Sequence, residues 1–327
     1  MAEPACWALT TGEAGAVSQA AGLAEAVGLP WVAKRIELRR PWRWLPGHLC
    51  PQPLSGLGPG GDRLAPPWPE LLISCGRRAV AAAIAIRRRA AGGTFAVHVQ
   101  HPHVPTSCFD MVVPPRHDRL AGANVHATRV ALHGITAAKL AEAGAHFRSR
   151  FAHLPRPLVA VLVGGDSGSY RLTPETARDL ADRLAALARE AGAGLIVTVS
   201  RRTGAGNTAV LRARLGAAGA EVWDGSGENP YLGMLALADH IVVTADSVSM
   251  VSEACATGKP VHVFPLPGGS ARFRRFHDAL SAEGVTRPFS GRLDSWSYPP
   301  ILEAEAVGAI VRAKLETRRA PAGAAGG

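Results

Sequence analysis

A row of polar residues interrupts an apolar region late in the sequence. Read at helical spacing, Asp246, Ser249 and Glu253 fall on one face of a predicted helix whose other face is apolar. The flanking runs, residues 240–243 and 261–264, indicate buried strands, so the apolar face is expected to be core. A carboxylate on the polar face can accept hydrogen bonds from two vicinal ribose hydroxyls, and a helix start attracts phosphate. Most helical glutamates are merely solvated, so the segment predicts a nucleotide site only together with neighbouring groups.

Two further segments carry groups that suit a phosphate. Gly164-Gly165-Asp166-Ser167 follows the predicted strand Leu158–Val163, and Ser200-Arg201-Arg202 closes the predicted strand Leu195–Ser200. Ligands of open parallel sheets bind beyond the carboxyl ends of the strands. Glycine lets the backbone approach a ligand closely, and a charge-assisted hydrogen bond from arginine to phosphate contributes about 1.5–3 kcal/mol. A tight turn and a solvated arginine pair are the plainer alternatives, and neither segment matches a GxGxxG or Walker A motif.

These segments together predict the nucleotide-diphosphate half of a site. Asn229 and Tyr231 open a further predicted helix near it, and the alternative role of Asn229 is that of a helix cap. The candidate nucleotide- and phosphate-binding residues are Gly164, Gly165, Ser167, Ser200, Arg201, Arg202, Asn229, Asp246, Ser247, Ser249 and Glu253.

The elements that must position these residues alternate along the whole chain. Short apolar runs, which predict strands, are separated by Ala-rich patterns of helical period, and this alternation favours parallel sheets flanked by helices. The segment RSRFAHLPRPLVAV breaks the alternation with two prolines and predicts a linker near residue 155. We therefore expect two Rossmann-like α/β domains, residues 1–152 and 153–300. A separate helix is expected over 301–317, and the Pro/Gly-rich residues 318–327 are expected to be disordered.

Composition limits the classes of protein to consider. The chain has 327 residues, 47% of them hydrophobic, and no apolar run near the roughly 18 residues that span a bilayer. The five scattered cysteines form no zinc-binding spacing, so no metal site is expected, and the lack of a secretory signal favours a cytoplasmic protein. The formal charge of +10 comes mostly from arginine, which reflects either genome composition or an anionic partner. No nucleic-acid-binding motif is present, so nucleic acid is not expected as a partner.

One basic segment is interleaved with aromatic residues. In KRIELRRPWRWLP, arginines alternate with Trp42, Trp44 and Leu45, which suits the interface of an anionic membrane. The plainer alternative is an edge strand followed by a loop. Lys34–Leu45 is therefore a candidate surface for peripheral binding at the inner face of a membrane.

Several motifs in order resemble a known family. LISCGRRAVAAAIA, FDMVVPPRHD, GANVHAT, VTVSRRTG, ENPYLGMLALAD and TADSVSMVSEACATGKPVHVF are similar to the bacterial relatives of the mitochondrial-fission ELM family. That family in turn resembles glycosyltransferases of the GT-B fold, which implies two Rossmann-like domains with parallel sheets facing a central cleft. The terminal helix would then cross back to the first domain. Glu253 followed by Gly258-Lys259-Pro260 looks like the nucleotide-binding pattern of the peptidoglycan N-acetylglucosaminyltransferase.

The resemblance implies a metal-independent glycosyltransferase that uses a nucleotide-diphosphate sugar as donor and needs no cofactor. Its acceptor would be a cell-envelope or other molecule. Arg201 or Arg202 would stabilise the departing diphosphate, and Glu13, His101 or His117 would be the base for the acceptor hydroxyl. Glu13 lies in TTGEAGAVSQ, which resembles the first motif of lipid A disaccharide synthase but lacks its Ser-Gly-Asp triplet. The alternatives are a non-catalytic GT-B-like scaffold that binds a protein partner or a membrane, and a nucleotide-sugar epimerase.

Overall fold

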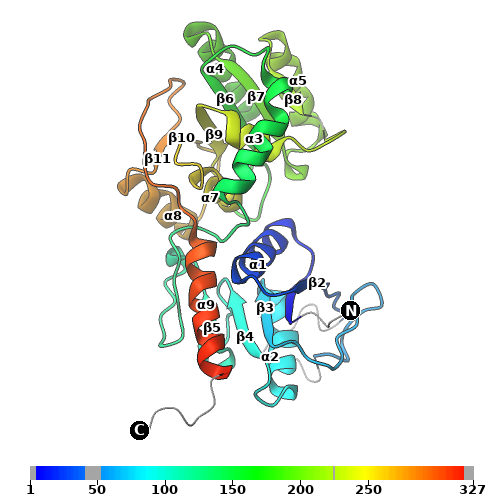
Figure 1. The fold of residues 1–327 in the computed structure, drawn as a ribbon. Helices are drawn as coiled ribbons and strands as arrows, with labels where there is room; N and C mark the ends of the chain where they lie inside the picture. The colour runs from blue at the N-terminus through cyan, green and yellow to red at the C-terminus, as the bar shows by residue number, and fades with distance from the viewer. Residues whose placement is uncertain (1–4, 41–52, 224, 320–327) are drawn as a thin grey trace, which may run out of the picture. The chain divides into compact units, whose positions relative to one another are not determined.

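The chain forms two compact units. The computed structural model describes residues 5–40, 53–223 and 225–319. Unit 1 comprises residues 1–134 with 302–327, and unit 2 comprises residues 135–301 (Figure 1). The division after Gly134 lies earlier than the expected one after residue 152, because α3 (Ala137–Phe151) packs against α6 (Tyr231–Leu237) within unit 2. The two helices approach closely: a Cβ on Gly233 would lie 2.5 Å from the Phe147 ring.

Unit 1 is a five-stranded parallel sheet with helices on both faces. Its strands lie in the order β2-β1-β3-β4-β5, where β1 is Cys6–Thr10, β2 Trp31–Arg35, β3 Leu71–Cys75, β4 Phe95–Val99 and β5 Met111–Val113. Alternate strand residues pack under α1 (Ala14–Val27) and α9 (Glu303–Arg319) on one face, and under α2 (Val80–Arg89) on the other. The sheet runs outward from β1 to β2, then restarts with β3 on the other side, so its order reverses between β1 and β3.

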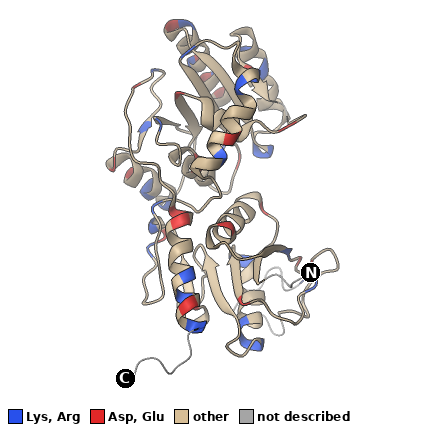
Figure 2. Cartoon of the chain, in the orientation of Figure 1, with Lys and Arg blue, Asp and Glu red and all other residues tan. Residues whose placement is uncertain are grey.

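Helix α9, far from the rest of unit 1 in sequence, completes its core against α1. A Cβ on Gly308 would lie 2.8 Å from the backbone of Ala26, so the two helices are in close contact there. The Arg312 guanidinium donates to the carbonyls of Ala26 and Val27 at the end of α1. The helix begins with Glu303 and Glu305 and ends with basic residues, which suits its dipole (Figure 2). Arg318 and Arg319 belong to this helix, and residues 320–327 of the expected disordered tail lie outside the described residues.

Unit 2 is a six-stranded parallel sheet. The order is β11-β10-β9-β6-β7-β8, with β6 Leu158–Val163, β7 Gly194–Val199, β8 Glu221–Trp223, β9 His240–Thr244, β10 Val261–Phe264 and β11 Thr286–Pro288. The remaining helices are α4 (Pro174–Ala191), α5 (Ala205–Ala217), α7 (Val248–Cys255) and α8 (Ala271–Ala282). The order reverses between β6 and β9, and in such sheets ligands bind beyond the carboxyl ends of the strands at this point. The expected α/β architecture with two Rossmann-like parallel sheets is confirmed.

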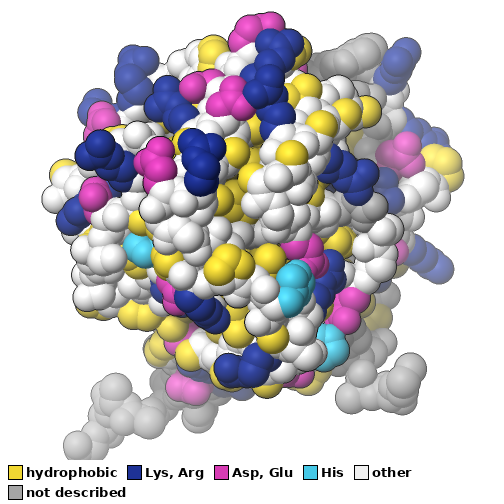
Figure 3. Space-filling model, turned by 90° about the horizontal axis from the view of Figure 1, so that it is seen from above, with side chains coloured by type: hydrophobic (Ala, Val, Ile, Leu, Met, Phe, Trp, Pro, Cys, Tyr) yellow, Lys and Arg dark blue, Asp and Glu magenta, His cyan; other side chains and the backbone are white. Residues whose placement is uncertain are grey.

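The surface and the helices bear on the membrane prediction. In the described ranges, no helix is both long and apolar enough to cross a membrane. On the face shown in Figure 3, Lys and Arg side chains stand among Asp and Glu side chains. Within the candidate segment Lys34–Leu45, Lys34 belongs to β2 and its ammonium lies 5.0 Å from the centre of the Trp7 ring. The aromatic part of that segment, with Trp42 and Trp44, lies outside the described residues.

Candidate functional site

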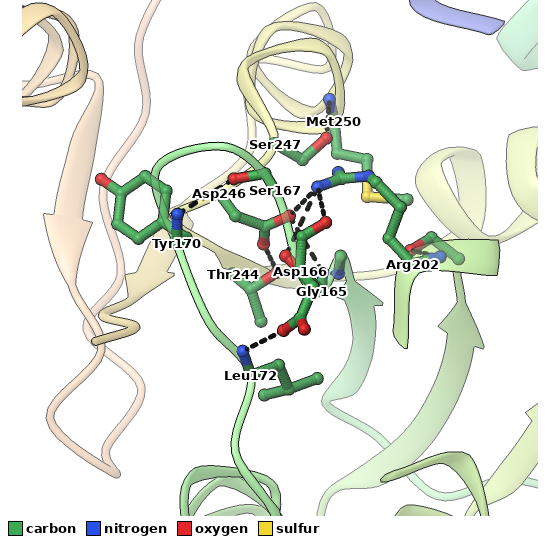
Figure 4. Close-up of polar contacts among 12 residues, drawn as sticks. Gly165, Asp166, Ser167, Tyr170, Leu172, Arg202, Thr244, Asp246, Ser247 and Met250 are labelled. Carbon is green, nitrogen blue, oxygen red and sulfur yellow. Dashed lines mark hydrogen bonds and ion pairs between the residues drawn. The ribbon is translucent and has the colours of Figure 1, made fainter. Parts of the chain in front are cut away.

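A buried carboxylate joins three segments at the carboxyl edge of the unit 2 sheet. Asp246 follows β9, and its side chain is fully buried. Its Oδ2 accepts a hydrogen bond from the Gly165 N–H at 2.9 Å and lies 2.7 Å from the guanidinium of Arg202. Its Oδ1 accepts from the Thr244 hydroxyl at 2.7 Å, and that hydroxyl oxygen accepts from the Gly164 N–H at 2.8 Å. Asp246 therefore links the ends of β6, β7 and β9 at the point where the strand order reverses (Figure 4).

The two glycines after β6 are needed for this close packing. A Cβ on Gly164 would lie 2.3 Å from the carboxylate oxygens of Asp246, and a Cβ on Gly165 would lie 2.1 Å from the Arg202 carbonyl oxygen. The sequence favoured a close approach of backbone to ligand at these glycines. In the structure the close approach is to Asp246 and to the turn that carries Arg202.

The two arginines after β7 differ in their surroundings. The Arg202 guanidinium, besides its ion pair with Asp246, lies 3.4 Å from the carbonyl oxygens of Gly165 and Asp166, so it holds the glycine turn. Arg201 is exposed, and among the described residues no hydrogen bond or ion pair involves its side chain. The Ser200 hydroxyl oxygen accepts from the Arg202 N–H at 3.2 Å and caps the short turn Arg201–Thr203. Of Ser200, Arg201 and Arg202, Arg201 is therefore the residue whose exposed side chain makes no hydrogen bond or ion pair within the described chain.

The loop after the glycines is held by its own hydrogen bonds. The Ser167 hydroxyl oxygen accepts from the N–H groups of Ser169 and Tyr170, at 3.3 and 3.1 Å, and the Asp166 carboxylate accepts from the Leu172 N–H at 2.8 Å (Figure 4). The Tyr170 ring meets the Phe273 ring edge-on at 5.0 Å. The loop is thus preorganised before any ligand arrives.

Helix α7 begins beside this network. The Ser247 hydroxyl caps it by accepting from the Met250 N–H at 3.3 Å, and Ser249 lies half-buried in the first turn. One turn further on, the Tyr231 hydroxyl donates to Glu253 Oε2 at 2.5 Å. Burial and the neighbouring Glu253 raise the pKa of Tyr231 well above its usual value, so the phenol remains a donor that orients the carboxylate. Of the predicted polar face, Ser249 and Glu253 are partly accessible, whereas Asp246 is not.

Two residues near α6 have structural roles. The Asn229 side chain accepts from the Tyr231 N–H at 3.1 Å, so it binds the first N–H of α6, whose N-cap residue is Pro230 and not Asn229. Lys259 precedes β10, at the opposite edge of the sheet from Asp246, and its ammonium donates to the carbonyls of Leu235 and Ala236, at 2.9 and 2.5 Å. Burial lowers the pKa of Lys259 to about 8. The lysine of the GKP pattern therefore caps the end of α6 and does not reach the edge with the glycine turn.

Sequence reasoning missed the residues that follow β10. Gly268-Gly269-Ser270 leads into α8, where the Ser270 hydroxyl caps the helix and Arg274 lies exposed near Tyr170. The His277 ring nitrogen Nε2 lies 2.8 Å from the Ala245 carbonyl oxygen, which steadies the chain just before Asp246. The sequence carries a signal for these residues, because PGGSARFRR follows the apolar run of β10 and contains glycines, a serine and arginines, like the segments that follow β6 and β7.

The candidate acceptor bases lie in unit 1 in different settings. Glu13 is exposed, accepts from the Thr11 hydroxyl at 2.5 Å, and has its Oε1 3.4 Å from the Arg78 guanidinium. His101 follows β4, and its Nδ1 accepts from the His103 N–H at 2.9 Å. His117 is buried beside Asp118, with Nε2 and Oδ1 3.7 Å apart, so of the three candidates it is the least accessible to a ligand. Within the ranges that the structure describes, no three His, Cys, Asp or Glu side chains are grouped closely enough to hold a metal ion.

Solved structures share this fold at low sequence identity. The UDP-GlcNAc 2-epimerase of Methanocaldococcus jannaschii, solved with UDP-GlcNAc and UDP, matches with a TM-score of 0.55 and 12% identity over 94% of this chain and 98% of that one. The UDP-GlcNAc 2-epimerase of Neisseria meningitidis, bound to UDP-GlcNAc, matches with a TM-score of 0.50 and 11% identity over 95% of this chain and 99% of that one. These likenesses place the chain in the GT-B fold class.

Sequence relatives are more specific. The chain is 36% identical over 277 residues to the mitochondrial fission protein ELM1 of Arabidopsis thaliana. The matched region covers 76% of this chain and 65% of that protein. The chain thus spans about two thirds of the plant protein's length. It is also 25% identical over 291 residues to an uncharacterised protein of Rickettsia prowazekii, covering 77% of this chain and 81% of that one. The model of the family described as mitochondrial fission ELM1 matches residues 14–315. The chain therefore belongs to the mitochondrial fission ELM1 family.

Proposed function

We propose that unit 2 binds a nucleoside-diphosphate sugar at the carboxyl edge of its sheet, and that the protein is a glycosyltransferase acting without a metal ion. The observation that carries this proposal is the edge organised by Asp246. There, a glycine turn and a helix start are held together where the strand order reverses, and the exposed Arg201 belongs to the turn that follows β7 at the same edge. The UDP-GlcNAc present in two solved proteins of the same fold supports trying uridine nucleotides first.

Each part of the edge has a role in this proposal. The diphosphate lies at the start of α7, where the helix dipole and first-turn N–H groups favour negative charge. Arg201 supplies the fixed positive charge that stabilises the diphosphate as it leaves, which is why no metal ion is invoked. Glu253, oriented by Tyr231, accepts hydrogen bonds from the ribose hydroxyls. Asp246 and Arg202 do not contact the donor and hold the turn in place.

Sugar transfer also requires a base for the acceptor hydroxyl. Glu13 is the exposed carboxylate among the unit 1 candidates, and its orientation is held by Thr11 and Arg78. We assign it this role within the proposal, as the group that takes the acceptor proton.

Calorimetric titration of UDP and UDP-GlcNAc into the full chain tests the binding step. Arg201→Gln should weaken UDP binding by about ten-fold or more, because one charge-assisted hydrogen bond to phosphate is lost. The matched control is Arg189→Gln, which removes the same charge from an exposed position in the last turn of α4, at the opposite edge of the sheet. Equal effects of the two variants, or no binding of any nucleotide at millimolar concentration, would contradict the proposal.

Product analysis separates the reaction classes once a nucleotide binds. A transferase releases UDP only when an acceptor is present, whereas an epimerase changes the sugar without one. A protein that binds UDP-GlcNAc but yields neither product with cell-envelope extracts would be a binding scaffold, and the transferase proposal would then be rejected.

A further inference from the structure

A cluster of arginines lies at the carboxyl edge of the unit 1 sheet. Arg35 ends β2, Glu13 follows β1, and Arg77 and Arg78 follow β3. These three strands are neighbours in the order β2-β1-β3 and run parallel, so the four residues share one edge. The strand order of this sheet reverses between β1 and β3, which is where ligands of such sheets bind.

Short contacts show that the cluster is assembled. The Arg78 guanidinium lies 3.4 Å from Glu13 Oε1. The Arg35 side chain passes over Gly12, where an added Cβ would lie 3.0 Å from its Nε. A Cβ on Gly76, at the start of the arginine turn, would lie 3.9 Å from the Ala16 Cβ in the first turn of α1. The ends of β1, β2 and β3 are therefore in contact through these side chains.

The cluster carries excess positive charge that faces solvent. Besides Glu13, the exposed Asp62 carboxylate lies at this edge, where it accepts from the Arg35 N–H at 2.6 Å. Three guanidinium groups against two carboxylates leave one positive charge, and Arg35, Arg77, Arg78 and Glu13 are exposed. Arg78 is paired with Glu13, whereas within the described chain no carboxylate pairs with Arg35 or Arg77. Guanidinium groups bind phosphate by two parallel hydrogen bonds and are weakly hydrated, which suits them to this ligand.

We propose that this edge binds a phosphate ester that also carries a free hydroxyl group. Arg35 and Arg77 hold the phosphate, and Glu13, kept in place by Thr11 and Arg78, accepts a hydrogen bond from the hydroxyl. The binding site rests on these contacts and on the position of Arg77 in the turn after β3, at the same edge of the sheet. That its ligand is the acceptor of sugar transfer rests on the proposed function of unit 2.

Titration of glycerol 3-phosphate into the full chain, at low ionic strength and with saturating UDP, tests the site. The double variant Arg35→Gln/Arg77→Gln should weaken binding by about ten-fold or more, because both unpaired guanidinium groups are removed. The matched control, Arg88→Gln/Arg89→Gln, removes two exposed charges from the end of α2, at the opposite edge of the same sheet, and should leave binding unchanged. Glycerol, which lacks the phosphate, should not bind. Equal losses in both double variants, or no binding by the unaltered protein to either glycerol 3-phosphate or vesicles, would overturn the proposal.

Two further arms identify the source of the phosphate and keep the two proposals separate. Vesicles of phosphatidylglycerol present a phosphate ester and free hydroxyl groups on a lipid, and vesicles of phosphatidylcholine are the comparison. If the protein binds phosphatidylglycerol vesicles, and this binding is lost in Arg35→Gln/Arg77→Gln but not in Arg88→Gln/Arg89→Gln, the ligand is a lipid. Binding of glycerol 3-phosphate without vesicle binding points to a soluble one. Titration without UDP, in the Arg201→Gln variant, should still show glycerol 3-phosphate binding. The unit 1 site can therefore be confirmed even if unit 2 binds no nucleotide, and it can fail while unit 2 binds.

Discussion

Asp246 connects the elements of the candidate site through one side chain. Its carboxylate satisfies the Gly165 N–H and the Thr244 hydroxyl and pairs with the half-exposed Arg202. Asp246→Ala leaves two buried donors without an acceptor, and each such group costs about 1–3 kcal/mol. We expect the free energy of unfolding to fall by about 3 kcal/mol, measured by urea denaturation. Asp179→Ala removes a carboxylate from an exposed pair with Arg183 and should cost less than about 1 kcal/mol. Similar losses in the two variants would show that Asp246 has no such joining role.

Glu253 and Tyr231 make a prediction about binding at the same scale. If Glu253 accepts from ribose hydroxyls, Glu253→Gln should weaken UDP binding several-fold and leave pyrophosphate binding unchanged, since pyrophosphate has no ribose. Tyr231→Phe removes only the donor that orients the carboxylate and should produce the smaller loss. The check is a pair of calorimetric titrations for each variant. Parallel loss of UDP and pyrophosphate affinity would place Glu253 at the phosphates or in the fold.

At the scale of elements, the contact of α9 with α1 can be tested with one methyl group. Gly308→Ala places a Cβ 2.8 Å from the Ala26 backbone, so one helix must shift, and overpacking of this kind costs about 1–3 kcal/mol. Gly216→Ala, in the exposed and open part of α5, meets no atom within 4 Å and should stabilise unit 2 by up to about 1 kcal/mol through helix propensity. The same substitution thus has opposite signs at the two positions. Thermal and urea unfolding of both variants measure it, and a stabilising Gly308→Ala would contradict the close packing.

At the scale of the whole molecule, each unit buries a neutral histidine. Burial, reinforced by His101 and His103, lowers the pKa of His98 in unit 1 to about 3, and burial with the nearby His240 lowers that of His262 in unit 2 to about 4. Below the ordinary histidine pKa of about 6.5, these two histidines bind protons in the unfolded chain but stay neutral in the folded chain. The stabilisation that comes from keeping these histidines neutral is therefore complete above about pH 6.5. The free energy of unfolding should fall by about 1.4 kcal/mol per pH unit for each histidine as the pH drops from 6.5 towards the folded pKa values.

The His262→Phe variant isolates the contribution of unit 2 to this acid sensitivity. The phenyl ring suits the surrounding Trp296 and Phe289 rings, which lie 5.0 and 6.3 Å from the His262 ring. Urea unfolding at pH 7 and pH 5 should show a smaller difference in this variant than in the unaltered protein. The control, His153→Phe at an exposed position, should keep the full difference. An unchanged difference in His262→Phe would refute the role of His262.

The sequence predicted the architecture and most of the edge, because alternating apolar runs and the residues after each strand are local signals. It could not assign partners. Asp246 was predicted to face a ligand, but its carboxylate accepts a hydrogen bond from Gly165, which lies 81 residues earlier. The two residues meet because β6 pairs with β9, and this pairing cannot be read from either segment alone. Tyr231 as the partner of Glu253, and Lys259 as a cap for α6, likewise depend on contacts between distant segments. The division after Gly134 escaped prediction because the sequence of α3 does not say which sheet it covers.

The placement of α9 in unit 1 has a consequence for how the protein is made. The strands and first helices of unit 1 leave the ribosome early, but the helix that covers α1 is encoded after all of unit 2. At synthesis rates of roughly 5–20 residues per second, the intervening residues 135–301 occupy on the order of ten seconds or more. During that time α1 can pack on its sheet, but the side of α1 that contacts α9 has no partner, whereas unit 2 is continuous and can fold as soon as it emerges. We therefore expect unit 2 of the nascent chain to complete its folding first. We expect chaperones to bind unit 1, whose surface for α9 stays exposed until α9 is synthesised.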